Sequence, residues 1–282
     1  RENRILTEKQ KTAKKIEHQK ELLSIKNKNI SDSILYAKRI IDAMMPSDTF
    51  IKRLIPHSFV FFMPKDIVSG DFYWIDIKDD VVYVAVVDCT GHGVPGAFMS
   101  IVGLNLLRDI LTLGVERPAA ILDRMSRDVR EIFSTEEDNK QVRDGMDMTI
   151  CAIDRTNKRL EFAGAKNPLY LIRNDRIIEY KGDRFSVGPG SDDGQKFKNH
   201  LIEMEDDDMI YMFSDGYADQ VGGPKAKKFK YRRFRSVLLD IYTKRPETQK
   251  KELQDIITRW KAGTEQVDDM LVMGIRPMKE PG

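Results

Sequence analysis

The stretch VVYVAVVDCTGHGVPG, residues 81–96, decides how the rest of this chain is interpreted. Its first seven residues are apolar and mostly β-branched, which predicts a buried strand that ends at Asp88. Three glycines follow within six residues, and Pro95 stands where the first turn of a helix would begin. The turn lacks both the Lys-Ser/Thr end of a Walker A loop and the spacing of a dinucleotide-binding loop. A carboxylate and a glycine-rich turn before a helix are typical of a site for a metal ion or a phosphate.

Other aspartates stand in the same kind of position beside short apolar runs. They are Asp71 before residues 72–77, Asp215 after residues 209–213, and Asp268 and Asp269 before residues 270–275. Each Asp-Gly pair alone is typical of a turn, but together these residues can bring four carboxylates to one edge of a sheet sandwich. Such a cluster would be repulsive unless a divalent cation neutralised it. The conjunction predicts a site for Mn²⁺ or Mg²⁺, both of which prefer oxygen ligands.

The remaining pattern predicts an α+β fold. Short runs rich in β-branched and aromatic residues predict strands at 58–63, 72–77, 81–88, 148–154, 159–163, 169–173, 176–180, 209–214 and 270–275. Helices are predicted at 95–113, 118–133, 232–242 and 247–262, and hairpin turns at Asp79-Asp80 and Asn174-Asp175. Because strands do not alternate singly with helices, we expect a central antiparallel β-sandwich flanked by helices.

Residues 1–45 contain no glycine or proline and are rich in Lys, Glu, Gln and Asn. One apolar stripe runs along them: Ile16, Leu23, Ile30, Ile34, Ile41 and Met44. This spacing predicts a long helix close to a coiled-coil seam, and hence a homodimer through residues 1–45. The alternative is a connector helix that packs on its own domain. We expect a helical linker at 1–50 and a catalytic domain at 56–277.

Composition limits the class of protein. The net charge of +2 gives no global argument for nucleic-acid binding, and we expect none. The basic and aromatic run 222–235 is open to three interpretations: a substrate-docking flap, a solvated surface loop or a nucleic-acid contact. Cys89 and Cys151 lack CxxC spacing, which favours buried, reduced thiols in a cytoplasmic protein. The sequence begins at Arg1 without a methionine, so we expect a longer chain, with room for a sensor or membrane anchor upstream.

The order of the aspartate motifs resembles the bacterial branch of metal-dependent serine/threonine phosphatases, the PPM family with the type 2C fold. Within it, the SpoIIE- and RsbU-like serine phosphatases are the most similar branch. The resemblance covers about residues 56–277. It rests on Ser69-Gly70-Asp71-Phe72-Tyr73, Asp88-x-x-Gly91-His92-Gly93, Phe213-Ser214-Asp215-Gly216 and Asp268-Asp269-Met270.

This resemblance implies two Mn²⁺ or Mg²⁺ ions at one edge of the sandwich. Asp88 would bridge both ions, with the backbone carbonyl of Cys89 as a further ligand. Asp71 would hold one ion, while Asp215 and Asp268 would hold the other. A hydroxide bridging the ions would attack phosphorus in line and displace the serine or threonine oxygen.

Other positions match the family pattern only in part. Asp269 would support the ligands, and Asp147 would lie where relatives can hold a third ion. His92 is a candidate general acid, although eukaryotic members place their histidine at the position of Thr90. Their phosphate-binding arginine has no assignable counterpart here, and Lys65 is a candidate for that role.

The resulting expectation is a phosphatase acting on phosphoserine or phosphothreonine in a regulatory protein, such as an anti-sigma-factor antagonist. An upstream sensor would control it through the linker helix. One alternative is a catalytically inactive domain that binds a phosphoprotein, which the full set of aspartates argues against. Another is a different two-metal phosphoesterase or nuclease, which four histidines and a near-neutral charge disfavour.

Overall fold

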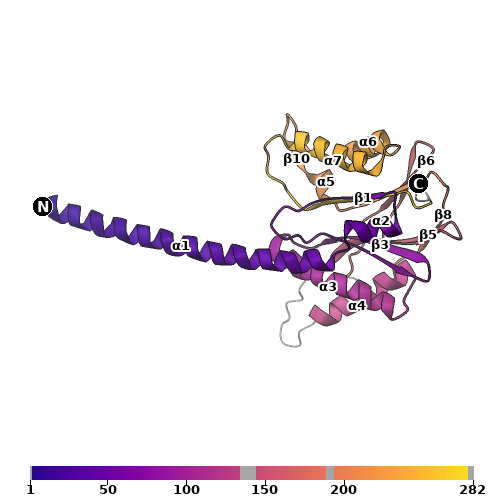
Figure 1. Cartoon of the computed structure of the whole chain (residues 1–282), viewed down its shortest axis with the longest axis horizontal. Coiled ribbons are helices and arrows are strands. Elements are labelled where there is room, and N and C mark those ends of the chain that lie inside the picture. Colours follow the sequence, from indigo (N-terminus) through magenta and orange to yellow (C-terminus); the bar gives the residue numbers. More distant parts are fainter. Residues whose placement is uncertain (1, 134–143, 189–193, 279–282) are drawn as a thin grey trace.

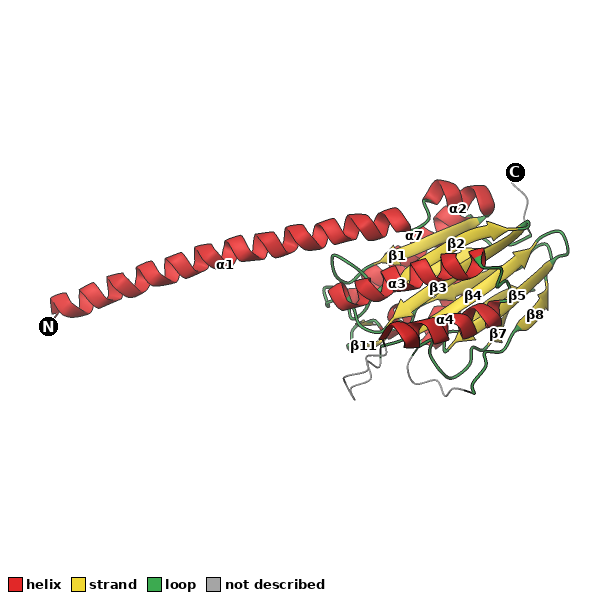
Figure 2. Ribbon diagram, turned by 90° about the horizontal axis from the view of Figure 1, so that it is seen from below, coloured by secondary structure: helices red, strands yellow, loops and turns green. Residues whose placement is uncertain are grey.

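The computed structural model describes residues 2–133, 144–188 and 194–278 and has four layers, with two sheets between two sets of helices (Figures 1 and 2). The first sheet contains, in spatial order, β1 (Ser58–Met63), β12 (Met270–Ile275), β9 (Met209–Phe213), β6 (Leu169–Arg173) and β7 (Arg176–Tyr180). The second sheet contains β2 (Phe72–Lys78), β3 (Val81–Cys89), β4 (Met146–Asp154), β5 (Arg159–Ala165) and β8 (His200–Glu203). Every neighbouring pair of these strands is antiparallel. The expected α+β fold with a central β-sandwich is confirmed.

Side-chain alternation along β3 shows how the layers are built. Val84 and Val86 point into the core between the two sheets. Ala85 and Val87 point to the opposite face, where they contact the helical layer. A strand with both faces covered is apolar at nearly every position, which is why residues 81–87 form a continuous apolar run.

Helices cover the outer face of each sheet. The second sheet is covered by α3 (Gly93–Thr112) and α4 (Pro118–Phe133). The first sheet is covered by α5 (Gly216–Asp219), α6 (Tyr231–Ile241) and α7 (Pro246–Lys261), with the small hairpin β10 (Val221–Gly222) and β11 (Lys227–Lys228) beside them. By length and composition α3 could cross a membrane, but half of it is buried inside the protein, which accounts for its apolar character.

The long helix α1 (Glu2–Met44) extends away from these layers (Figure 1), and α2 (Asp48–Leu54) follows it with Ser47 as its N-cap. The apolar stripe of α1 divides into two parts. Its first three members, Ile16, Leu23 and Ile30, are 48%, 60% and 58% exposed. Further along, Ile41 is buried against Val68 and Ala97. The connector interpretation therefore holds for the docked end of α1, and the dimer seam stays a prediction for the exposed part.

Several predicted details are confirmed and others need correction. Both hairpin turns have two consecutive residues at positive φ, 49° and 61° at Asp79-Asp80 and 50° and 58° at Asn174-Asp175, as type I′ turns require. The strand predicted at 148–154 begins two residues earlier, so Asp147 lies within β4 and not before it. Likewise α3 begins at Gly93 and not at Pro95.

The sequence did not indicate four short elements: β8, α5, β10 and β11. They contain two to four residues each, too few for a periodic pattern to appear. Much of the polar loop expected at 182–199 is described, but residues 189–193 lie outside the described part of the chain. Residues 222–235 are the β10–β11 hairpin and the first half of α6, and not an irregular loop.

Candidate metal centre and phosphate site

Four aspartates predicted from the sequence meet at one edge of the sandwich, which we call the acidic edge: Asp71, Asp88, Asp215 and Asp268. Asp71 precedes β2 and Asp88 lies near the end of β3, so both belong to the second sheet. Asp215 follows β9 and Asp268 precedes β12 in the first sheet. Their charges act on one another across the two sheets, because Asp88 and Asp268 both raise the pKa of Asp71. In the same way Asp215 and Asp268 raise that of Asp88.

Burial is the largest cause of the unusual pKa values at the acidic edge. It raises the pKa of Asp88 to about 8, with Asp215, Asp268 and Asp147 as the next contributors. Burial also raises the pKa of Asp215 to about 6, followed by repulsion from Asp219 and Asp268. The pKa of Asp71 lies well above its usual range because the carboxyl is buried and close to Asp88. These carboxylates are therefore costly to ionise together in the absence of a cation.

An unsatisfied oxygen at Asp71 shows that the acidic edge fits a hard cation. Asp71 is 4% exposed, and its Oδ2 has no hydrogen-bond partner. A buried carboxylate oxygen without a partner is unusual in a folded protein, and a divalent ion would satisfy it. Among the described residues no group of three His, Cys, Asp or Glu side chains lies close enough together to hold a metal ion as the side chains stand.

Two glycines allow the segments that carry Asp71 and Asp88 to approach closely. A Cβ on Gly70 would lie 2.5 Å from the carbonyl oxygen of Gly91 and 3.3 Å from that of Cys89. A Cβ on Gly96 would lie 2.1 Å from the same Gly91 oxygen. Only glycine fits at either position without backbone movement. The close packing also brings the Cys89 carbonyl, a predicted ligand, beside the segment that precedes Asp71.

Asp269 and Asp147 are already held by protein groups. The Asp269 carboxylate accepts hydrogen bonds from the backbone N–H groups of Lys65 and Gly70, at 2.7 and 2.9 Å. It fixes the chain next to Asp71. Asp147 lies directly opposite Asp88 in the β3–β4 ladder. One of its oxygens accepts from Ser186 at 2.6 Å and the other is 3.2 Å from the Lys166 ammonium.

His92 lies between two charged side chains at the mouth of the glycine-rich loop. Its Nδ1 is 2.7 Å from Asp66 Oδ2, and its Nε2 is 3.0 Å from Lys65 Nζ. A carboxylate only accepts and an ammonium only donates, so this arrangement has Nδ1 protonated and Nε2 as acceptor. Because Lys65 is also tied through its backbone to Asp269, the three side chains border the acidic edge.

Comparison with known proteins identifies the family. The family model described as Stage II sporulation protein E (SpoIIE) matches residues 78–277, more than half of the chain. The chain belongs to the SpoIIE family. It has the fold of the PP2C phosphatases. The sequence is 24% identical over 209 residues to Stage II sporulation protein E from Priestia megaterium, covering 73% of this chain. This SpoIIE-family chain spans about a third (33%) of the length of that relative.

Solved structures agree with this assignment. The SiaA-PP2C domain of Pseudomonas aeruginosa is 31% identical, with a TM-score of 0.80 over 89% of this chain and 98% of that one. A PP2C phosphatase domain with a regulatory fragment of SpoIIE from Bacillus subtilis is 21% identical, with a TM-score of 0.63. That likeness covers 78% of this chain and 61% of the other, and it shows a shared fold.

The SpoIIE motifs predicted which aspartates meet, but not every residue that positions them. Asp66 was missed, because it lies in an irregular stretch with no periodic pattern. Ser100 was missed as well; it is fully buried in α3 and donates its hydroxyl to the carbonyl oxygen of Gly70 at 2.8 Å. The one signal for Ser100 in the sequence was a serine within an otherwise apolar stretch of the predicted helix, because a buried hydroxyl needs a hydrogen-bond partner. Cys89 and Cys151 are free and buried, in keeping with the predicted reduced thiols.

Proposed function

We propose that this chain is a metal-dependent phosphatase that hydrolyses phosphoserine or phosphothreonine on a regulatory protein, of the kind represented by an anti-sigma-factor antagonist. The observation that carries the proposal is the acidic edge with its buried, unpartnered Asp71 oxygen. Asp71, Asp88, Asp215 and Asp268, with the Cys89 carbonyl, would hold two Mn²⁺ or Mg²⁺ ions. When bound, such ions lower the pKa of water and neutralise charge on phosphoryl oxygens.

The side chains around His92 would handle the phosphate and the leaving group. Lys65 is a cation at the mouth of the acidic edge, and its ammonium would bind a phosphate oxygen in place of His92 Nε2. That exchange frees Nε2 to carry a proton to the departing serine or threonine oxygen. Asp66 accepts from Nδ1 and would hold the ring in its orientation. The arrangement supports general acid catalysis without a protein nucleophile.

The deciding experiment measures phosphate release from a phosphoserine peptide with and without Mn²⁺. We expect metal-dependent turnover in the wild type and loss of at least about a hundredfold in Asp88→Ala and Asp215→Ala. Asp109→Ala, at an exposed position of α3, is the control and should retain full activity. If the wild type binds the phosphopeptide but releases no phosphate at millimolar Mn²⁺, the alternative of an inactive phosphoprotein-binding domain is correct.

We further propose that α1 links this domain to an upstream sensor and pairs with a second copy in a cytoplasmic homodimer. The exposed half of its stripe supplies the seam, while its docked end lies against the phosphatase domain. Ile41 and Met45 line a small crevice that Ser69 and Asp71 also line. Movement of the docked end would thus act directly on a segment that carries a metal ligand.

Sedimentation of the full chain tests the pairing. Leu23→Asp should convert a dimer to a monomer, because it places a charge in the seam. The matched control Ser24→Asp, one residue along on an exposed surface, should remain dimeric. Equal behaviour of the two variants would remove the seam proposal.

A further inference from the structure

An open pocket of about 610 Å³ lies where the β10–β11 hairpin meets the start of α6 and the end of α7. We call it the basic pocket, because its lining includes Lys225, Lys227, Lys228, Lys230, Arg232 and Arg233. Six cations within nine residues are a local excess in a chain of net charge +2. In the part of the chain that the structure describes, Lys228 alone among the six is ion-paired with a carboxylate, that of Asp219 at 2.7 Å.

The floor of the basic pocket is built from aromatic residues that are already in contact with one another. The Arg233 guanidinium stacks 4.1 Å above the Trp260 ring, and Phe229 meets the same ring edge-on at 5.4 Å. Trp260 Nε1 donates to the Gln220 carbonyl at 3.0 Å, and its own carbonyl accepts from the Gly223 N–H at 2.8 Å. These contacts fix the indole in place beneath the cations.

The basic pocket adjoins the acidic edge through α5 and the first residue of α6. Asp219, the partner of Lys228, lies four residues after Asp215 in the same turn of chain. Tyr231 lies on the other side, with its ring centroid 6.1 Å from that of Phe213 at the end of β9. Burial raises its pKa, and the next contributor is the charge of Asp215, so the two side chains are close.

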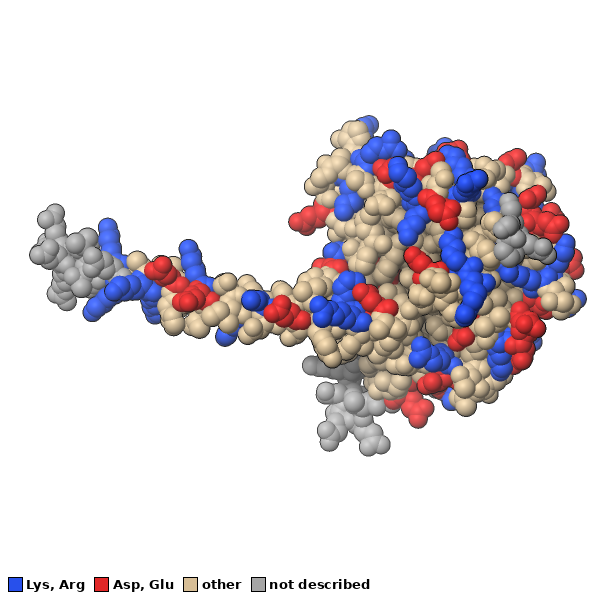
Figure 3. All heavy atoms as spheres, viewed as in Figure 1, with Lys and Arg blue, Asp and Glu red and all other residues tan. Residues whose placement is uncertain are grey.

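The contacts of the floor favour an acidic peptide over nucleic acid. Proteins that bind single strands stack bases on free aromatic faces. Here Arg233 already covers the Trp260 ring, and Phe229 is 3% exposed. What remains accessible is a set of flexible ammonium and guanidinium groups, which suit scattered carboxylates. Figure 3 shows acidic and basic side chains interspersed over the visible face of the molecule, without the continuous basic stripe typical of nucleic-acid binding.

We propose that the basic pocket docks an acidic segment of the phosphoprotein substrate, a few residues away from the phosphoserine that enters the acidic edge. This inference rests on the proposed phosphatase function. An extended peptide advances about 3.3 Å per residue, so a short spacer is enough to bridge adjacent sites. The carboxylates of the substrate pair with Lys225, Lys227 and Arg232, and they raise affinity without changing the chemistry at phosphorus.

The test compares two phosphoserine peptides that differ only in flanking glutamates, replaced by glutamine in the second. Lys225→Gln/Lys227→Gln should raise KM for the acidic peptide about tenfold, because each exposed charge pair contributes up to ~0.7 kcal/mol. It should leave kcat and the neutral peptide unchanged. The matched control Arg108→Gln/Lys198→Gln removes the same charge from exposed positions on α3 and before β8, and it should behave as wild type.

A second measurement does not depend on catalysis. Fluorescence anisotropy of a labelled acidic peptide that carries no phosphate should show salt-sensitive binding to the wild type and about tenfold weaker binding to the pocket variant. If the chain hydrolyses neither phosphopeptide but still binds this probe, the docking site stands and the proposed function fails.

Three results overturn the docking site. The first is an equal change in KM for both phosphopeptides. The second is unchanged binding of the phosphate-free probe in the variant. The third is tighter binding of a single-stranded RNA than of the acidic peptide, with loss in the pocket variant.

Discussion

Asp88→Asn should stabilise the metal-free protein at pH 8. Asp88 has a pKa of about 8 in the folded chain, against 3.8 in an unfolded one, because it is buried and faces Asp215, Asp268 and Asp147. Between these two values the folded state binds more protons than the unfolded state. Stability of the metal-free protein therefore falls as pH rises from about 4 to 8, and it is greatest below pH 4 as far as this group is concerned.

The shift of about four units sets an upper limit of roughly 5–6 kcal/mol on this cost at pH 8. The neighbouring carboxylates share the repulsion, so a single substitution should recover about half of it, ~2–3 kcal/mol. For a domain of this size that corresponds to roughly 5–10 °C in Tm. Asparagine has nearly the same shape, and it retains an oxygen that can accept from the backbone N–H of Asp215, a contact that opposes the rise in the pKa of Asp88.

Thermal unfolding followed by fluorescence in EDTA, at pH 5, 6.5 and 8, measures the effect. The Tm difference between Asp88→Asn and wild type should grow with pH, and added Mn²⁺ should raise the Tm of the wild type alone. Asp109→Asn, an exposed carboxylate on α3, should show neither effect. A variant that is less stable than wild type in EDTA at pH 8, or a difference independent of pH, would refute the electrostatic reasoning.

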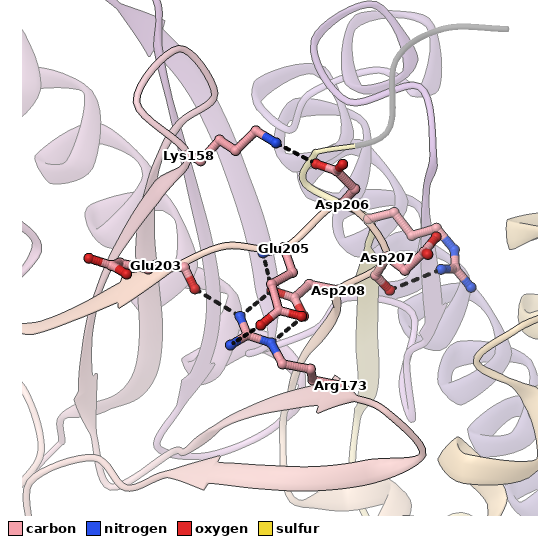
Figure 4. Close-up of polar contacts among 8 residues, drawn as sticks. Lys158, Arg173, Glu203, Glu205, Asp206, Asp207 and Asp208 are labelled. Atoms are coloured by element: carbon pink, nitrogen blue, oxygen red, sulfur yellow. Dashed lines mark hydrogen bonds and ion pairs between the residues drawn. The ribbon is translucent and has the colours of Figure 1, made fainter.

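Three further predictions concern other parts of the molecule. Arg173→Met should destabilise the fold by about 3 kcal/mol without changing kcat, because it leaves the fully buried Asp208 carboxylate without its bidentate partner at 2.6 and 2.8 Å (Figure 4). Urea unfolding measures this loss of stability. The control Lys158→Met, which breaks the exposed ion pair with Asp206, should cost less than about 0.5 kcal/mol. Asp66→Asn should lower kcat about tenfold, since the His92 ring loses the carboxylate that holds its Nδ1; an unchanged kcat would remove Asp66 from the mechanism. Gly70→Ala should abolish stabilisation of the protein by Mn²⁺, because its Cβ would lie 2.5 Å from the Gly91 carbonyl oxygen. The control Gly194→Ala has open space around the new Cβ and should keep that stabilisation. Calorimetric titration with Mn²⁺ compares the two variants.

The sequence predicted the elements whose physical cause is local. The five valines of residues 81–87 indicate a strand buried on both faces, and Asp-Asp and Asn-Asp pairs indicate tight turns with positive φ. Aspartates at strand ends predicted the acidic edge, because antiparallel order brings those ends together. The same reasoning could not reach β8, which has four residues at the edge of a sheet and forms through its pairing with β5.

Contacts between distant segments lay beyond the sequence pattern. The hydrogen bond from the Lys65 N–H to Asp269 joins residues 204 positions apart. No local preference of residues 64–70 indicates that Asp66 would meet His92. The stripe on α1 was predicted correctly as a stripe, yet periodicity does not specify what covers it. Ile41 is buried on the phosphatase domain while Leu23, on the same stripe, remains exposed.

The proposed control through α1 depends on where the acidic edge lies in the fold. Asp71 and Asp88 belong to the second sheet and Asp215 and Asp268 to the first, so bound ions would join the two sheets at this end. The core between the sheets is continuous and apolar, and close-packed cores resist small displacements. The segment that precedes Asp71 is different, because it is held by Asp269, by Ser100 and by the docked end of α1 at Val68. If α1 transmits a signal as proposed, that signal needs to move only this segment, which lies three residues before the predicted metal ligand Asp71, and both sheets can stay in place. Weakening this contact by Ile41→Ala should lower the affinity for Mn²⁺ more than it lowers the stability of the sandwich, and a titration of Mn²⁺ against Tm distinguishes the two.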